Sequence, residues 1–290
     1  MSTPSVAEQV VSFVKKNAQL ALLFAKGTPD VRTYYNVRNL ETMFGHSGPS
    51  FNFGYWVGQG ESQPQTIDEA NRAMYDLVAR WAQISAEHKV LDVGCGFGLA
   101  DVHFAQTFHC QVTGLNLSDV QLAECERRSR QSGREITYVH GSATQMPLAD
   151  ASFDRAFSIE AALHFDTRET FLAEAMRVLK PGGRLVLADM VFPEPESIGQ
   201  RMNLWLLKRG AQVPQRNVYD TQQYIARVKH AGFQIVHTES IAKDVYKPFQ
   251  GWAKRNPGYL LTISPVMLAS NMFMFLYPLD YILVVAEKPR

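Results

Sequence analysis

The chain has 290 residues, of which 46% are hydrophobic and 20% charged, the composition of an ordinary globular protein. Lys and Arg number 29 against 28 Asp and Glu, and a formal net charge of +1 argues against a nucleic-acid partner. Three cysteines without a CxxC pair argue against a zinc site and predict reduced thiols, and the missing secretion-signal pattern predicts a cytoplasmic protein.

Residues 1–87 are predicted to form amino-terminal helices and an aromatic lid. Apolar residues recur at helical spacing between Val6 and Phe24, and a second amphipathic helix is predicted over residues 66–82. Residues 34–60 mix glycine, asparagine, serine and aromatic residues without periodicity, which predicts a loop-rich lid. Its rings include Tyr34, Tyr35, Tyr55 and Trp56.

From residue 88, short apolar runs alternate with amphipathic segments. This order is typical of parallel strands joined by crossover helices, and it predicts an α/β Rossmann-like fold. We expect a seven-stranded, mostly parallel sheet with helices on both faces. Strands are predicted over residues 89–93, 111–115, 136–139, 153–159, 184–189, 233–239 and 281–287, and helices over 100–107, 119–131, 168–179 and 221–231.

Two insertions are predicted to cap this second domain, residues 88–290. The first, at about 193–220, is bounded by prolines, and the second, at about 245–278, is rich in Met, Leu and Phe. Their apolar residues predict an acceptor-binding surface, although a homodimer interface or local core gives the same pattern. Prolines divide the apolar stretch from Tyr259 to Val285 into pieces too short to span a bilayer. Lys208, Arg209 and Arg216 are alternative ligands for an anionic group of an amphiphilic substrate.

A glycine loop follows the strand at 89–93 and opens a helix. Gly94 and Gly96 permit a tight turn and the close approach of a ligand to the backbone, near the N–H groups of the helix start. A nicotinamide dinucleotide site would favour GxGxxG and an acidic residue at the end of the second strand. Here the loop reads GCGFG and the neutral Asn116 stands at that strand end, which disfavours a dehydrogenase. Ser118 suits a helix N-cap.

Together with the segments 141–148, 152–154 and 178–183, these residues resemble the class I S-adenosylmethionine (SAM)-dependent methyltransferases over about residues 88–190. The similarity is greatest to the small-molecule branch that contains quinone, tocopherol, sterol and antibiotic-tailoring enzymes. It implies a SAM-binding catalytic domain whose product is S-adenosylhomocysteine. Asn116 and Ser142 depart from positions that are often acidic in this family, so we expect neutral hydrogen bonds there. The predicted cofactor residues are Tyr35, Trp56, Asp92, Gly94, Cys95, Gly96, Asn116, Leu117, Gln121, Ser142, Ala143 and Ser158.

The segment after the fourth strand, up to His164, is the predicted reacting side, because ligands of open α/β sheets bind at this edge. Methyl transfer to a hydroxyl requires alignment and the removal of one proton, and no metal is predicted. His164 is the candidate base, since the ordinary pKa of an imidazole, about 6.5, lies near neutral pH. The resemblance to antibiotic-sugar O-methyltransferases implies that Asp189 orients it. Glu160 is expected to support the SAM amino group, face the acceptor or cap a helix.

The sequence thus predicts O-methylation of a small, apolar or amphiphilic natural product such as a polyketide, glycoside or isoprenoid. One alternative is C-methylation of a prenyl or sterol-like double bond, with Glu160 and aromatic rings stabilising a developing cation. Another is a non-catalytic SAM-binding module that docks a partner through its apolar cap.

Overall fold

The computed structural model describes residues 31–38, 52–57, 64–256 and 277–290, together with helical positions 15, 18–19, 21–22 and 25–26. Its seven-stranded sheet has the order β3-β2-β1-β4-β5-β7-β6, in which β7 runs antiparallel to β5 and β6 and the remaining pairs are parallel. The predicted Rossmann-like, mostly parallel sheet is confirmed. The strands are β1 Lys89–Val93, β2 Gln111–Asn116, β3 Thr137–His140, β4 Phe153–Ile159, β5 Leu179–Val191, β6 Gln234–Ser240 and β7 Asp280–Glu287.

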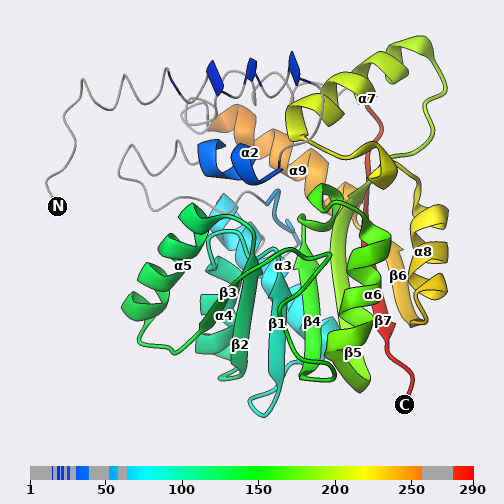
Figure 1. The fold of residues 1–290 in the computed structure, drawn as a ribbon. Helices are drawn as coiled ribbons and strands as arrows, with labels where there is room; N and C mark the ends of the chain where they lie inside the picture. Colours follow the sequence, from blue (N-terminus) through cyan, green and yellow to red (C-terminus); the bar gives the residue numbers. More distant parts are fainter. Residues whose placement is uncertain are drawn as a thin grey trace, which may run out of the picture.

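Helices cover both faces of the sheet, and α2, α7 and α9 gather beyond one of its ends (Figure 1). The helices are α2 Val31–Arg38, α3 Ile67–Ala82, α4 Leu99–Thr107, α5 Asp119–Ser132, α6 Arg168–Val178, α7 Ile198–Ala211, α8 Thr221–His230 and α9 Ala242–Arg255, and the short 3-10 helices are η2 Ala162–His164 and η3 Gln215–Asn217. In the described part of the chain, no helix is long and apolar enough to cross a bilayer.

Local sequence signals explain where the predicted helices begin. At the start of α3, the Glu69 backbone N–H donates to the Thr66 hydroxyl and the Glu69 carboxylate accepts from the Thr66 N–H, both at 3.2 Å. This capping box satisfies two N–H groups that lack partners within the helix. Ser118 caps α5 in the predicted way, since its hydroxyl accepts from the Gln121 N–H at 3.3 Å.

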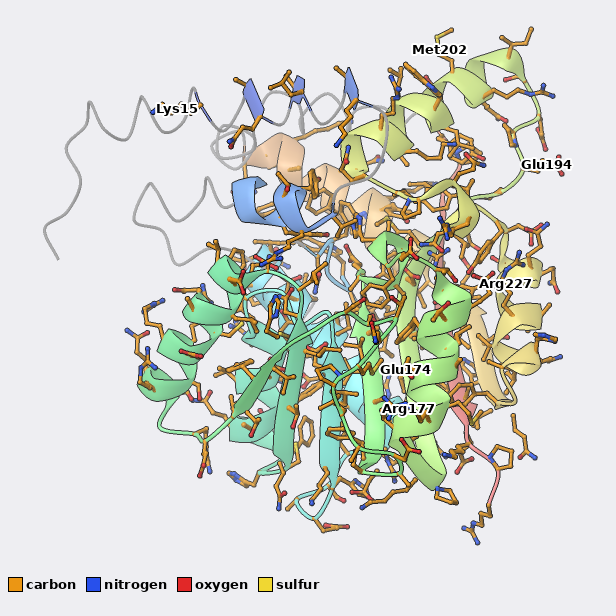
Figure 2. The ribbon with its side chains drawn as sticks, in the orientation of Figure 1. Lys15, Glu174, Arg177, Glu194, Met202 and Arg227 are labelled. Atoms are coloured by element: carbon orange, nitrogen blue, oxygen red, sulfur yellow. The ribbon has the colours of Figure 1, made fainter. Side chains whose placement is uncertain are left out.

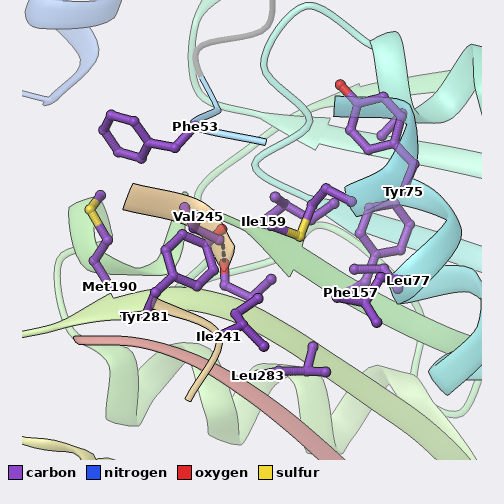
Figure 3. Close-up of a cluster of buried hydrophobic side chains, with 14 of the residues drawn as sticks. Phe53, Tyr75, Leu77, Phe157, Ile159, Met190, Ile241, Val245, Tyr281 and Leu283 are labelled. Carbon is purple, nitrogen blue, oxygen red and sulfur yellow. Dashed lines mark hydrogen bonds between the residues drawn. The ribbon is translucent and has the colours of Figure 1, made fainter. Parts of the chain in front are cut away.

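Alternate residues of the strands supply two hydrophobic cores, one on each face of the sheet. In β1, Val90 belongs to the core that faces α3 and α9, whereas Leu91 belongs to the core that faces α6 and α8. Figure 3 shows Phe157 and Leu283 of the sheet with Leu77 of α3 in the first of these cores. Burying each such side chain contributes roughly 1.5–3 kcal/mol to the stability of the fold. The two cores therefore hold the strands, and with them the strand ends at the site, in fixed positions.

Most charged residues of the covering helices are partly or fully exposed. Glu174 and Arg177 of α6 form an ion pair at 2.8 Å (Figure 2). On α7, Met202 and Trp205 are exposed, whereas Leu204 and Leu207 are buried in the core. The apolar residues of this cap therefore divide between the core and the outer surface.

The structure differs from the predicted elements in three places. Tyr34 and Tyr35 belong to helix α2 rather than to a loop. Strand β5 begins at Leu179 rather than at the predicted residue 184, so it includes Gly182 and Gly183. Helix α9 overlaps the start of the predicted 245–278 insertion. Residues 257–276 and most of the predicted first helix lie outside the described residues, and the domain boundary near residue 88 stays a prediction.

Candidate active site

The carboxyl ends of β1, β2 and β4 surround a cavity of about 490 Å³. Its lining brings together most of the predicted site residues. From the described part of the 193–220 cap, Pro214 lines the cavity, and the apolar residues of α7 do not. The predicted residues that line it are Tyr35, Asp92, Gly94, Cys95, Gly96, Asn116, Leu117, Gln121, Ser142, Ala143, Glu160 and His164.

The glycine loop after β1 forms one wall of this cavity. Gly94 has φ of 87°, and a Cβ atom there would lie 2.5 Å from the Cβ of Ala161, closer than real Cβ contacts allow. Gly96 also has a positive φ, of 54°, but a Cβ added there meets nothing within 4 Å. Gly94 thus lets the loop pack against the segment after β4, while Gly96 leaves open space for a ligand.

Asn116 joins the glycine loop to the start of α5. Its amide Nδ2 donates to the Gly96 carbonyl and to Gln121 Oε1, both at 3.0 Å, and its Oδ1 accepts from the Ser118 N–H at 3.1 Å. A carboxylate cannot donate to the Gly96 carbonyl, which explains why a neutral residue suits this strand end.

Gln121 offers the clearest fit to a cofactor hydroxyl. The residue is buried and lines the cavity, and its Nε2 has no hydrogen-bond partner among the described residues. A buried donor without an acceptor is costly, so a ribose hydroxyl would satisfy it. The nearby Ser142 hydroxyl lies 2.9 Å from that of Thr144, in a local turn at the cavity wall.

Two acidic side chains lie buried behind the glycine loop. Asp92 is the penultimate residue of β1, and Asp101 lies in the first turn of α4. Burial raises the pKa of Asp101 to about 7, and burial together with the neighbouring Asp101 raises the pKa of Asp92 well above its ordinary value. Asp101 was missed from the sequence, where an acidic residue at a helix start normally suggests only an exposed favourable position.

Glu160 is held at the cavity by three separate segments. Its Oε1 accepts from the Phe53 N–H at 2.9 Å and from the Tyr281 hydroxyl at 3.0 Å, and its own N–H donates to the Ala188 carbonyl at 2.8 Å. Its φ of 51° lies in the left-handed region that favours glycine. Such strain in a residue other than glycine persists where surrounding contacts fix it, often at functional sites.

His164, the last residue of the turn η2, lines the cavity together with Glu160. Its ring is buried, and it meets the Tyr35 ring edge-on with centroids 5.4 Å apart, while the Tyr34 ring lies 6.4 Å away. The lid helix α2 therefore covers the candidate base. The described residues contain no group of three His, Cys, Asp or Glu side chains placed to hold a metal.

The structure does not pair Asp189 with His164. Asp189 is fully buried, and its Oδ2 lies 2.8 Å from Arg168 Nη2 and accepts from the Tyr224 hydroxyl at 3.1 Å. Its Oδ1 accepts from the Met190 N–H at 2.9 Å. A buried carboxylate requires a charged partner, and the permanently charged guanidinium of Arg168 meets this need better than an imidazole. Sequence reasoning missed Arg168 because an arginine at a helix start gives no sign of burial.

Trp56 and Ser158 lie outside the cavity lining. The Trp56 Nε1 donates to the Phe53 carbonyl at 2.8 Å, and its ring packs against Trp252 in the core. The hydroxyl of Ser158 donates to the Val93 carbonyl at 2.9 Å and ties β4 to β1. Both residues shape the site from behind, since their polar groups are used within the fold.

Comparisons with known proteins agree with this geometry. A family described as a methyltransferase domain matches residues 91–187. An O-methyltransferase, resE, of Aspergillus sclerotiorum is 33% identical over 66% of this chain and 71% of its own length. Erythromycin 3''-O-methyltransferase of Saccharopolyspora erythraea is 30% identical over 83% of this chain and 84% of its own length.

A solved structure described as the [4+2]-cyclase SpnF superposes with a TM-score of 0.73 and 23% identity, over 90% of this chain and 97% of its own. At that identity the likeness supports the fold alone. The two curated relatives carry the assignment further, because each is at least 30% identical and most of its length is covered. The chain belongs to the SAM-dependent methyltransferases of the natural-product type.

Proposed function

We propose that this enzyme methylates a hydroxyl group of a small natural product, such as a polyketide, glycoside or isoprenoid, with His164 as the general base. The observation that carries the proposal is that His164 and the glycine loop line one cavity. The O-methyltransferases among its relatives support a hydroxyl as the acceptor.

The cofactor side of the cavity offers neutral donors and open backbone. When bound, SAM would supply an electrophilic methyl group on its sulfonium. Gly94, Cys95 and Gly96 suit its methionine part, and Ser142 and Ala143 suit the adenine. The Gln121 Nε2 suits a ribose hydroxyl, because it is buried and has no hydrogen-bond partner among the described residues.

The acceptor side supplies a base whose side chain is buried at the cavity. His164 takes the hydroxyl proton as the oxygen attacks, which leaves a charged imidazolium in a buried position. Glu160 lines the same cavity and replaces Asp189 as the anion that we assign to stabilising this charge. The acceptor then lies between the η2 turn, the ring of Tyr35 and Pro214, a mixed surface that suits an amphiphilic molecule.

C-methylation is the second candidate, and one observation favours it. A fixed carboxylate, Glu160, and an aromatic ring, Tyr35, line the cavity, and both stabilise cations. The products separate the two reactions, because an O-methyl ether is cleaved by hydriodic acid whereas a C-methyl group is not. The possible homodimer and the cytoplasmic location stay predictions beside this proposal.

The test is a transfer assay with methyl-labelled SAM on a panel of hydroxylated polyketides, glycosides and isoprenoids. His164→Gln keeps hydrogen-bonding capacity but loses the base, so we expect kcat to fall about 100-fold or more. SAM affinity, measured by calorimetry, should stay within about threefold. His230→Gln, on the exposed end of α8, is the matched control and should behave like the wild type.

Full turnover by His164→Gln would remove the base from the proposal. If no acceptor on the panel is methylated while a protein partner is captured through α7, the alternative of a non-catalytic SAM-binding module gains instead.

A further inference from the structure

The last residue of η3, Asn217, is fully buried, and all its polar groups are used. Its backbone N–H donates to the Pro214 carbonyl at 3.0 Å, and its backbone carbonyl accepts from Arg168 Nη1 at 2.6 Å. Its side-chain Oδ1 accepts from the Arg168 backbone N–H at 3.0 Å. Its Nδ2 donates to the carbonyls of Leu163 at 3.1 Å and Phe165 at 2.6 Å.

These two carbonyls flank His164. The turn η2 has its own bonds, from the His164 N–H to Ala161 at 2.9 Å and from the Phe165 N–H to Ala162 at 3.3 Å. Short 3-10 turns have poor hydrogen-bond geometry and little stability alone. The Asn217 amide therefore bonds to the backbone on both sides of the candidate base, although it lies more than 50 residues away along the chain.

Asn217 is itself anchored through Arg168. The buried guanidinium pairs with Asp189 at 2.8 Å, donates to the Met190 carbonyl at 2.6 Å and lies over the rings of Tyr219 and Tyr224 at 5.0 and 4.7 Å. Strand β5 thus holds Arg168, and Arg168 holds Asn217. Among the described residues, Asp189 and His164 are connected through these intermediates.

We propose that Asn217 is a positioning residue that sets the direction of the His164 imidazole in the cavity. The inference rests on the proposed role of His164 as base. The predicted cap at 193–220 then takes part in the reaction. One short segment of it contains both Pro214, which lines the cavity, and Asn217, which positions the base.

Two variants remove one or both of the hydrogen bonds that Asn217 Nδ2 donates to the Leu163 and Phe165 carbonyls. Asn217→Ser keeps a hydroxyl that can donate to one carbonyl, whereas Asn217→Asp keeps the shape but places a carboxylate against both carbonyls. Thr221→Val is the matched control, because it removes a hydrogen bond of 2.8 Å between Thr221 and Asp280 nearby without touching the η2 turn.

The first readout is the NMR signal of the His164 Cε1–H group in protein saturated with S-adenosylhomocysteine, identified by its loss in His164→Gln. We expect this signal to shift in Asn217→Ser, to shift further or broaden in Asn217→Asp, and to stay in place in Thr221→Val.

The second readout is kcat on an acceptor from the panel. It should fall about 10-fold for Asn217→Ser and about 100-fold for Asn217→Asp, because a misplacement near 1 Å has effects of that size. The KM for SAM should stay within about threefold.

A purely structural role predicts a different result. Asn217→Ser and Thr221→Val would then lose thermal stability together, and neither would move the His164 signal or separate kcat from KM. That outcome overturns the proposal, and failure of Asn217→Asp to fold leaves Asn217→Ser to decide it. Full activity of His164→Gln identifies failure of the proposed base instead, since the NMR result does not depend on turnover.

Discussion

The cavity has two walls that are held together in different ways. The cofactor wall consists of the glycine loop and the start of α5, and the acceptor wall consists of Glu160 and the η2 turn with His164. On the cofactor wall, Asn116 bonds to partners 20 and 5 residues away, Gly96 and Gln121. On the acceptor wall, Glu160 bonds to partners 107 and 121 residues away, Phe53 and Tyr281. The cofactor wall is therefore a local structure of loop and helix start, whereas the acceptor wall exists only when distant segments have packed.

This difference indicates how each wall responds to damage. A change in the buried contacts behind the acceptor wall should lower the stability of the fold and disturb His164 before it affects SAM binding. A change in the glycine loop should chiefly weaken SAM binding, and at Gly94 it also presses on Ala161 at the start of the η2 turn. Variants behind each wall test this difference.

The largest effect is expected for Arg168→Met behind the acceptor wall. The change leaves the fully buried Asp189 without its countercharge, and breaking a buried ion pair in this way lowers the free energy of unfolding by about 3–5 kcal/mol. Burial already raises the pKa of Asp189, against the lowering effect of Arg168. Without Arg168 the folded-state pKa rises further above the unfolded value, so the folded state binds the extra proton at low pH. The deficit, measured by urea unfolding, should therefore be smaller at pH 5 than at pH 8.

Arg168→Met/Asp189→Asn is the control for this prediction. Removing both charges should recover part of the lost stability and abolish the difference between the two pH values. A loss of SAM affinity beyond that explained by unfolding would contradict the separation of the two walls.

A middle-sized effect is expected for Gly94→Ala on the cofactor wall. Its methyl group would meet Ala161 at 2.5 Å, and φ of 87° is unfavourable for alanine. We expect SAM affinity to fall about 30-fold, which corresponds to about 2 kcal/mol. Gly133→Ala shares a positive φ of 67° but has nothing within 4 Å of its added methyl, so it should lower stability without changing SAM affinity. Equal SAM affinity in the two variants would show that the loop adapts.

Local signals made the sheet and the cofactor wall predictable. The bounds of β1 and β4 agree with the hydrophobic runs, and the capping residues Thr66 and Ser118 mark helix starts correctly. The glycine loop carries its own conformational requirement in its sequence. Each of these features depends on residues that are neighbours in the chain, which is why a sequence pattern reveals them.

The acceptor wall escaped prediction where its contacts are distant. Asp189 was expected beside His164, but the partner that its charge requires, Arg168, lies in another helix and is recognised only once both are buried. Trp56 was assigned to the cofactor because an aromatic lid pattern does not distinguish a ring over the cavity from one packed against Trp252. Asn217, which holds the His164 turn, gives no local signal in the sequence.

The smallest effect is expected for Asp101→Asn, behind the cofactor wall. Because the folded-state pKa of Asp101 is about 7 and its ordinary value 3.8, ionisation destabilises the fold increasingly as the pH rises between these values. Asparagine removes this penalty and can donate to Asp92, so the variant should gain on the order of 1–2 kcal/mol more at pH 8 than at pH 5. Thermal unfolding at both pH values measures the gain, with Glu126→Gln on the exposed face of α5 as the control. A gain that is the same at both pH values would mean that Asp101 is ionised throughout, and the cofactor wall would then depend on a buried charge as the acceptor wall does.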